Sequence, residues 1–322
     1  MQVGISERFG AAGHDLAHVS AIALAIEDRG FDSYWTPEHL AVRAGGDASF
    51  EEGDDVSELA RAPSFPDPFV NLAVVAAATT SLLIGTGVLL VPLHHPLAIA
   101  RAGATLDALS GGRFVLGAGI GWDPWEYESL GVPWAERGLR AVEHLQAVRA
   151  LWDEHPASFA GEHIAFERVV GEPRPATRVP ILLGGNSEGA LRRAVKVGDG
   201  WFGWGLDHDA LHDARRRLMM LLAAAGRDPA EFTIQLGTRF DGDRSKLARY
   251  AAGARARGVD RLVVTCGPEG TVSESELDAI RDACEPLGAC DSRTPVACTG
   301  PSQRELASGS APPASRKGAI TS

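Results

Sequence analysis

Two adjacent ionisable side chains, Glu38 and His39, follow the short apolar run that ends at Trp35. A carboxylate beside an imidazole can orient a ligand and transfer protons near neutral pH. The same two side chains could equally form a plain ion pair in a loop. Their position directly after a predicted strand favours a catalytic role for Glu38 and His39.

Thr86 lies between Gly85 and Gly87 in the continuous apolar stretch 82–90. Glycine weakens the interior of a strand, so two of them indicate a bulge or a backbone that a flat ligand approaches closely. The alternative is that they make room for a helix packed on the strand. Both interpretations remain open from these residues alone.

A second glycine-rich strand end, 117–121, contains Gly119 and runs into Trp122 and Trp125. Alternating glycines alone are weak evidence for a nucleotide site, and no acidic residue follows at the distance of a dinucleotide fingerprint. The indole rings suit a planar cofactor or an apolar substrate, although a lid packed on a barrel rim needs them equally. Together with Trp35, they are candidate residues of a substrate pocket.

Gly184 and Gly185 precede Asn186, Ser187 and the amphipathic stretch 188–197. Backbone N–H groups at the start of a helix, together with the helix dipole, attract an anion. Asn186 or Ser187 could instead be an ordinary N-cap. We favour a phosphate site formed by Gly184, Gly185 and Asn186.

Short β-type runs that alternate with helical stretches position these candidates. Eight such units can be counted, which predicts an α/β fold with a closed (β/α)8 barrel rather than an open sheet. In a barrel the functional groups gather at the carboxyl ends of the strands, where the candidates above are found. The predicted strands are 3–5, 33–35, 82–90, 114–119, 181–183, 200–204, 232–236 and 261–265.

One domain is predicted over residues 1–287, with a small hairpin inserted near 158–166. From 288 to 322, Ser, Pro, Ala, Gly and Thr dominate the sequence. Such a segment cannot build a core, so we predict a disordered tail.

Charge and composition exclude several classes of function. The net charge of −11 argues against a nucleic-acid partner, which needs a basic face. The four cysteines form no CxxC pair, and His94 and His95 have no further ligand at metal-site spacing, so no metal is predicted. We interpret the segment with His94 and His95 as a loop that caps the next helix. The N-terminus is too polar for a signal peptide, and the apolar run 82–93 is too short for a bilayer. A cytoplasmic protein without membrane partners is expected.

Taken together, these segments resemble the luciferase-like monooxygenase superfamily, and most closely its coenzyme F420-dependent oxidoreductases. The resemblance covers roughly residues 1–287 and is carried by 30–39, 83–96, 104–119, 181–194 and 198–201. It implies a bacterial-luciferase-like barrel with F420, or alternatively FMN, across its mouth. It further implies a non-prolyl cis peptide around Thr86, Gly87 and Val88 against the ring, and a homodimer formed by helices beside the second and third strands.

Within this resemblance, Gly184 and Gly185 would bind the cofactor phosphate, and Glu38 and His39 would face its ring. Sugar-phosphate dehydrogenases of the family carry an acidic residue where this chain has Trp122. That departure speaks against a sugar phosphate and favours an apolar or aromatic small molecule. The expected function is hydride transfer between F420 and an organic substrate. The alternatives are an FMN-dependent monooxygenase and a non-catalytic flavin-binding barrel.

Overall fold

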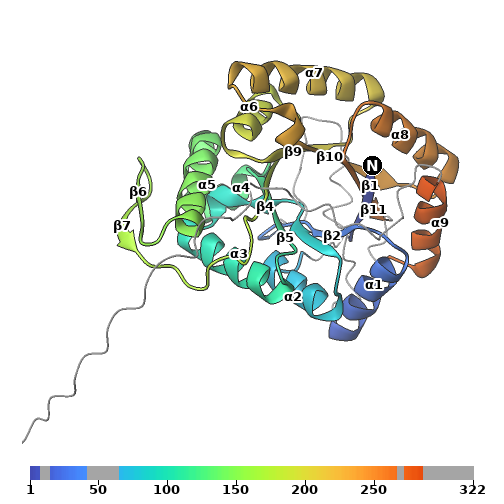
Figure 1. Ribbon diagram of the computed structural model, residues 1–322, viewed down its shortest axis with the longest axis horizontal. Helices are drawn as coiled ribbons and strands as arrows, with labels where there is room; N and C mark the ends of the chain where they lie inside the picture. The colour runs from blue at the N-terminus through green and yellow to red at the C-terminus, as the bar shows by residue number, and fades with distance from the viewer. Residues whose placement is uncertain (8–14, 42–64, 267–271, 286–322) are drawn as a thin grey trace, which may run out of the picture. The chain divides into compact units, whose positions relative to one another are not determined.

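A closed barrel of parallel strands forms the centre of the computed structural model, which describes residues 1–7, 15–41, 65–266 and 272–285 (Figure 1). Every neighbouring pair around the ring is parallel, and β3 pairs with β5 as well as with β2, which closes the barrel. The predicted barrel is therefore confirmed. Its strands are β1 (Gln2–Ser6), β2 (Ser33–Thr36), β3 (Leu83–Thr86), β4 (Leu89–Leu90), β5 (Phe114–Gly119), β8 (Ile181–Gly184), β9 (Gly200–Trp204), β10 (Thr233–Phe240) and β11 (Arg261–Cys266).

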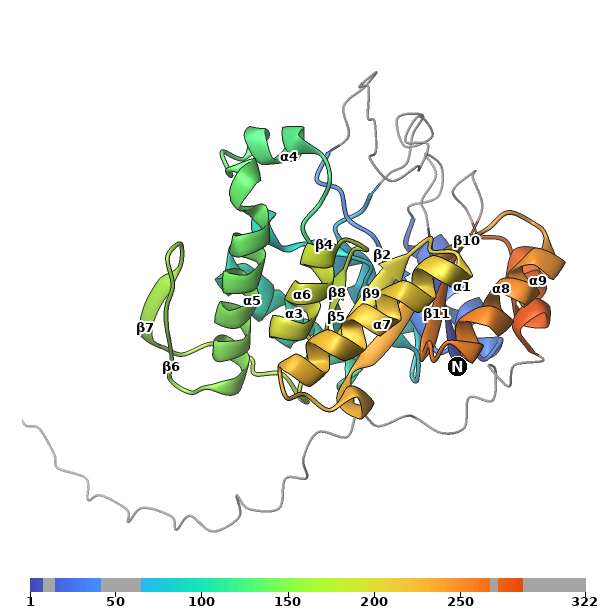
Figure 2. The same cartoon turned by 90° about the horizontal axis from the view of Figure 1, so that it is seen from above.

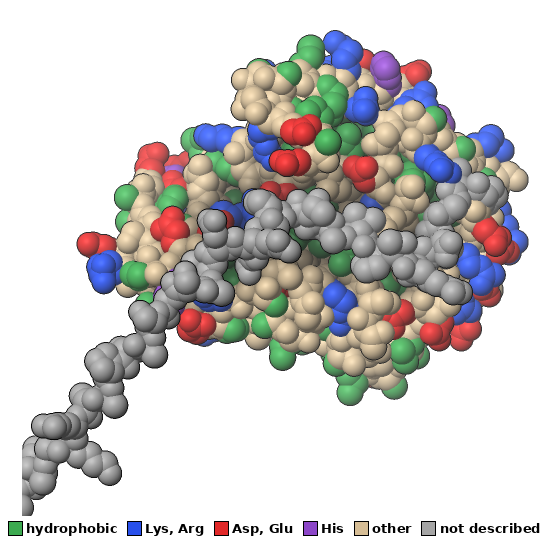
Figure 3. All heavy atoms as spheres, viewed as in Figure 1, with side chains coloured by type: hydrophobic (Ala, Val, Ile, Leu, Met, Phe, Trp, Pro, Cys, Tyr) green, Lys and Arg blue, Asp and Glu red, His purple; other side chains and the backbone are tan. Residues whose placement is uncertain are grey.

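Helices surround the barrel because each carries an apolar stripe that packs on the strands. Several begin with an Asp or Ser whose side chain accepts a hydrogen bond from a first-turn N–H, as Asp67 does for α2. The outer helices are α1 (Leu16–Asp28), α2 (Pro68–Ala78), α3 (Pro96–Ser110), α5 (Arg137–Asp153), α6 (Glu188–Val197), α7 (His208–Ala224), α8 (Arg244–Ala256) and α9 (Glu274–Cys284). Figure 3 shows their acidic and basic side chains interspersed around the rim.

Inside the barrel a small second core fills the space between the strands. It consists of Trp35, Val115, Leu182, Phe202 and Val263, and the rings of Trp35 and Phe202 meet edge to face at 5.4 Å. Trp35 is completely buried, so its prediction as a pocket residue is wrong in this structure. The inward position in β2 explains this burial, because a side chain there fills the barrel instead of its mouth.

The third barrel position departs from the single strand predicted over 82–90. Its apolar residues form two short strands, β3 and β4, separated by a cis peptide bond between Gly87 and Val88. The cis bond falls where the family resemblance implied it, which confirms that expectation. Gly85 faces the barrel interior, where a Cβ atom would lie 2.3 Å from the Trp35 ring, so this glycine also has a packing role.

The segment between β5 and α5 contains a short helix that the sequence analysis missed, α4 (Pro124–Ser129). Asp123 caps it and Pro124 occupies its first turn, a combination that starts a helix. Figure 2 shows α4 beyond the strand ends, away from the ring of outer helices. The helix therefore places the aromatic residues of this segment over the barrel mouth.

The remaining differences are small. The predicted hairpin is confirmed as β6 (Ala157–Ala160) and β7 (Ala165–Val169), and β10 extends four residues beyond the predicted 232–236. The predicted tail, 288–322, lies outside the described residues. Among the residues that are described, every helix is too short or too polar to cross a lipid bilayer.

Candidate active site at the barrel mouth

Glu38 lies just beyond β2 and is almost completely buried. Its carboxylate accepts a hydrogen bond from the backbone N–H of Leu90 at 2.6 Å and lies 2.8 Å from Nε2 of His94. Burial by itself lowers the pKa of His94, but the hydrogen bond and charge of Glu38 outweigh it and raise that pKa above 6.5. Glu38 thus links the end of β2 to the segment after β4.

The two histidines after β4 have separate roles. His95 is the N-cap of α3 and accepts a hydrogen bond from the N–H of Leu97, which confirms the predicted capping loop. His94 instead pairs with Glu38, a contact that the sequence analysis did not find. No spacing rule joins residues 56 positions apart in sequence, so the contact needed the fold.

His39 does not pair with Glu38, its neighbour in sequence, but with another carboxylate. Its Nδ1 lies 3.1 Å from Oε2 of Glu126, on α4, and the other oxygen of Glu126 accepts the backbone N–H of Leu40 at 2.8 Å. Glu38 and His39 therefore do not form the loop ion pair considered as the alternative, and their catalytic roles stay predictions. Glu38 pairs with His94, and His39 pairs with Glu126.

Aromatic side chains surround His39. The rings of Trp122 and Phe65 meet the imidazole edge to face, with centroids 5.2 Å and 4.9 Å away. Trp122 and Trp125 are both half-buried. Trp122 thus lies beside a candidate catalytic group, whereas a lid packed elsewhere on the rim would leave the two apart.

The segment between β3 and β4 lies at the carboxyl end of β3. Thr86 is fully buried, and its hydroxyl donates to the carbonyl of Gly117 at 2.7 Å. Gly87 and Val88 keep part of their surface exposed. Of the predicted ring contacts, Gly87 and Val88 can meet a ligand directly, whereas the Thr86 side chain holds β3 against β5.

Two glycines predicted to contact the cofactor have a clear packing role. A Cβ atom on Gly119 would lie 2.4 Å from Cγ2 of Val88, and one on Gly184 would lie 3.1 Å from its Cγ1. Contacts this short would force the Val88 side chain to move. Gly119 and Gly184 therefore make room for the Val88 side chain. Gly119 itself is buried.

The start of α6 differs in detail from the predicted phosphate site. The Asn186 side chain donates a hydrogen bond to the carbonyl of Trp204 at 2.7 Å and accepts one from the Trp204 N–H at 3.0 Å. It therefore joins the segment after β8 to the end of β9. The N–H of Gly185 donates to the carbonyl of Phe202 at 3.3 Å, and Ser187 caps the helix. Asn186 thus has a structural role, and the cofactor contacts predicted for Gly184, Gly185 and Asn186 stay predictions.

Replacing Asn186 by Ala should lower the free energy of unfolding by about 1–3 kcal/mol, because the two hydrogen bonds between its side chain and the Trp204 backbone are lost. Asn186→Asp keeps the acceptor and should lose roughly half as much. Urea denaturation monitored by circular dichroism measures both variants. Unchanged stability combined with lost cofactor binding would contradict the structural role of Asn186 and support a contact between Asn186 and the cofactor.

Two arginines, Arg137 and Arg193, lie close to the start of α6 and were not predicted as site residues. Arg193 belongs to α6. Its Nη1 would lie 3.3 Å from a Cβ atom on Gly189, at the start of α6, and 3.2 Å from one on Gly138, at the start of α5. The guanidinium therefore lies between the starts of these two helices. Burial and the nearby charge of Arg137 lower the pKa of Arg193. Within the described part of the chain neither guanidinium has an ion-pair partner, so this corner carries uncompensated positive charge.

A further buried acid, Glu7, follows β1 and was also missed. It accepts the Tyr34 hydroxyl hydrogen bond at 2.7 Å and lies 3.2 Å from Nε2 of His18. Burial raises the pKa of Glu7, although its hydrogen bonds oppose that rise. Its place directly after the first strand is the signal that could have drawn attention to it.

No group of three or more His, Cys, Asp or Glu side chains is placed to hold a metal ion among the residues that the structure describes. The chemistry available at the mouth is therefore that of the imidazole–carboxylate pairs, the aromatic rings and the positively charged corner at α6. A planar anionic cofactor matches this set, because rings and an anion are what these groups bind.

The comparisons with known proteins agree with this architecture. A family model of luciferase-like monooxygenases matches residues 1–240, and the chain belongs to that family. This family includes oxidoreductases that use F420 and others that use flavin.

Among individual relatives, an uncharacterised protein of Mycobacterium tuberculosis is 33% identical over 72% of this chain and 82% of its own length. An F420-dependent glucose-6-phosphate dehydrogenase of Nakamurella multipartita is 31% identical over 61% of this chain and 53% of its own. The solved structure of an F420-dependent secondary alcohol dehydrogenase with an F420–acetone adduct has a TM-score of 0.71 at 15% identity, covering 88% of this chain and 97% of that one. At that identity the last likeness supports the fold alone.

Proposed function

We propose that this protein is an oxidoreductase that transfers a hydride between coenzyme F420 and a small apolar organic substrate. The observation that carries the proposal is the pair of uncompensated guanidiniums, Arg137 and Arg193, at the start of α6. Both arginines are half-buried, and a phosphate group is the anion that a helix start and an arginine bind best.

The residues present fit such a cofactor. Arg137, Arg193 and the first-turn amides of α6 that Ser187 does not cap would hold its phosphate, since the first N–H groups of a helix have no partner within the helix. The exposed surface of Gly87 and Val88 would lie under its ring, with His39 nearby. When bound, F420 supplies a hydride equivalent, and the chain supplies position, exclusion of water and a proton.

The substrate class follows from the aromatic rings. Trp122 and Phe65 offer apolar surface beside His39, and Trp125 is half-buried on α4, whereas a sugar phosphate needs polar and basic partners. Trp122 also takes the position of the acid that sugar-phosphate dehydrogenases of the family carry. We therefore propose a neutral apolar ketone, aldehyde or conjugated alkene as substrate, although a relative bears the name of a glucose-6-phosphate dehydrogenase.

An FMN-dependent monooxygenase is the second candidate, favoured by the family's own description. The charged corner at α6 would bind the phosphate of FMN as readily as that of F420. The two functions differ in whether oxygen is consumed.

Turnover assays separate them. The protein is supplied with reduced F420 or reduced FMN and a panel of apolar carbonyl compounds, with and without oxygen. The proposal expects substrate-dependent oxidation of reduced F420 that persists without oxygen. Turnover that needs both oxygen and reduced FMN would replace the first function by the second.

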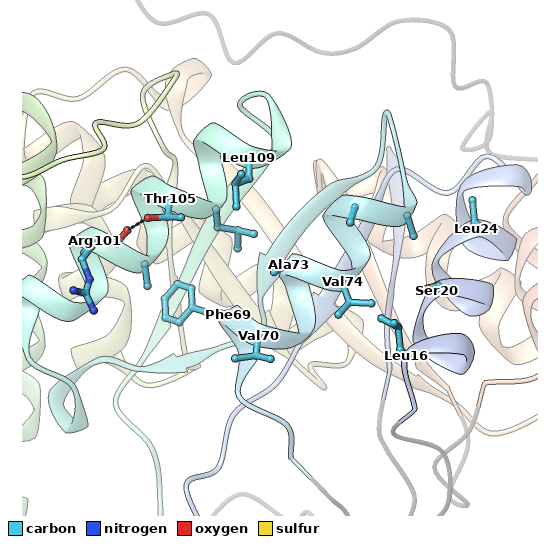
Figure 4. A pocket seen from close by; sticks show the side chains of 14 residues that line it. Leu16, Ser20, Leu24, Phe69, Val70, Ala73, Val74, Arg101, Thr105 and Leu109 are labelled. Carbon is cyan, nitrogen blue, oxygen red and sulfur yellow. Dashed lines mark hydrogen bonds between the residues drawn. The ribbon is translucent and has the colours of Figure 1, made fainter.

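We also propose that the protein is a homodimer. A groove of about 850 Å³ runs between α1, α2 and α3 on the outside of the barrel, and Figure 4 shows its largely apolar lining. Leu16, Val70 and Leu109 are 68%, 67% and 73% exposed there. Contiguous apolar surface of this kind marks an interface, and a second copy is the occupant we propose because these helices flank β2 and β3, where the family resemblance places the contact.

Replacing Val70 by Asp should convert the dimer to a monomer, because an isologous interface buries the new charge twice. Light scattering after size exclusion should give about twice the 33.9 kDa chain mass for the natural protein and 33.9 kDa for the variant. Met220→Asp, on exposed surface of α7, is the control and should stay dimeric. A natural protein that is monomeric at micromolar concentration would refute this proposal.

A further inference from the structure

The strongest unassigned feature of the mouth is the way Glu126 holds His39. The side chain of Glu126 is 1% exposed, and one of its oxygens lies 3.1 Å from Nδ1 of His39 while the other accepts the backbone N–H of Leu40. The carboxylate therefore binds both the imidazole and the backbone one residue further on. It reaches them from α4, 87 residues away in sequence.

The aromatic neighbours restrict the same ring. Phe65 and Trp122 each meet the imidazole edge to face, and the His39 side chain is only 10% exposed. Within the described ranges, Nε2 of His39 has no hydrogen-bond partner. With Nδ1 occupied by a carboxylate, Nε2 is the one ring nitrogen left for a ligand.

We propose that Glu126 is a positioning residue, which fixes the neutral His39 ring with its proton on Nδ1 and thereby makes Nε2 the atom that exchanges a proton with the substrate. This inference rests on the proposed function for its chemistry, whereas the tautomer itself is a property of the protein alone. A carboxylate accepts but cannot donate when ionised, so a neutral imidazole facing it must donate from Nδ1. Histidines held in this way by a carboxylate are a recurring arrangement in catalysis.

The proton balance of the reductive direction is simple. When bound, the reduced cofactor would supply a hydride: its bond to the cofactor would break, a C–H bond would form at the carbonyl carbon, and the carbonyl π pair would move to the oxygen. That oxygen takes the proton from Nε2 of the His39 imidazolium, which becomes neutral and keeps its Nδ1 proton toward Glu126. Solvent then restores the Nε2 proton. The substrate is reduced by two electrons and the cofactor is oxidised by two.

Glu38 does not share this arrangement. Its oxygens are bound to the N–H of Leu90 and to His94, so it faces the segment after β4. The acid beside His39 in sequence is thus not the acid that holds its ring. Only the fold brings Glu126 to that position.

Glu126→Gln tests the proposal, because one amide oxygen cannot accept from both His39 and Leu40. The exposed Glu128→Gln on the same helix is the matched control. NMR of protein labelled in the histidine ring nitrogens reports the tautomer without any cofactor, and His39→Asn identifies the signal. We expect Nδ1–H in the natural protein and in the control, and loss of that preference in Glu126→Gln.

In steady-state assays Glu126→Gln should lower kcat by about 10- to 100-fold, with KM and the Kd for F420 within about threefold of the natural values. A merely structural role would change binding and kcat together. If the variant fails to fold, the tautomer of the natural protein still decides, since a neutral His39 protonated on Nε2 overturns the proposal. Nδ1–H without turnover of any reduced cofactor would contradict the proposed function and leave the pairing intact.

Discussion

Replacing His39 by Asn should lower kcat with reduced F420 by about 10²- to 10⁴-fold, the usual contribution of a positioned general acid or base. Asn fills similar space and can still donate toward Glu126, so the loss reports on proton transfer rather than on a cavity. The Kd for F420 should stay within about threefold, because the phosphate corner at α6 is untouched. Stopped-flow oxidation of reduced F420 with substrate in excess gives the chemical step directly.

The control for this variant is His212→Asn, which changes an exposed histidine on α7, on the outside of the barrel. It should leave kcat unchanged. If His39→Asn retained the natural kcat, His39 would not transfer a proton in the reaction, and its pairing with Glu126 would be structural only.

The second large effect concerns folding. A Cβ atom at position 117 would lie 2.0 Å from the backbone carbonyl oxygen of Thr86, and β3 and β5 are already joined there by the Thr86 hydroxyl. Backbone cannot swing aside as a long side chain can, so Gly117→Ala must separate the two strands that close the barrel. We expect a loss of at least about 3 kcal/mol in the free energy of unfolding, at or beyond the upper end of ordinary overpacking.

Thermal unfolding and urea denaturation measure this loss, and Gly171→Ala is the matched control. A Cβ atom on Gly171 has its nearest neighbour at 4.0 Å, an ordinary contact, so that variant should be close to neutral. A stable Gly117→Ala protein with natural cofactor binding would show that the β3–β5 junction relaxes more easily than its geometry indicates.

The barrel could be predicted from the sequence because each strand–helix unit carries its own signal. Buried runs such as 114–119 and helices started by Asp67 or His95 depend on neighbours in sequence. The cis peptide between Gly87 and Val88 was anticipated through the family resemblance, not from the residues themselves. Local sequence patterns thus predicted the strands and helices that position the site.

The partners of the site residues could not be predicted in the same way. Glu38 and His39 are adjacent in sequence, yet one side chain turns to His94 and the other to Glu126. Trp35 seemed suited to a pocket wall, but strand alternation places it inside the barrel. These outcomes depend on which strand ends and helices meet in space, which sequence spacing does not encode.

The central claim is that the barrel mouth binds F420 through the arginine pair at α6. Isothermal titration of the purified protein with F420 and with FMN, repeated with Arg193→Gln, tests it most directly. We expect tight F420 binding and a loss of about 10-fold or more in F420 affinity for Arg193→Gln, which removes one charged phosphate contact. Tight FMN binding without F420 binding, or F420 affinity unchanged in Arg193→Gln, would contradict it.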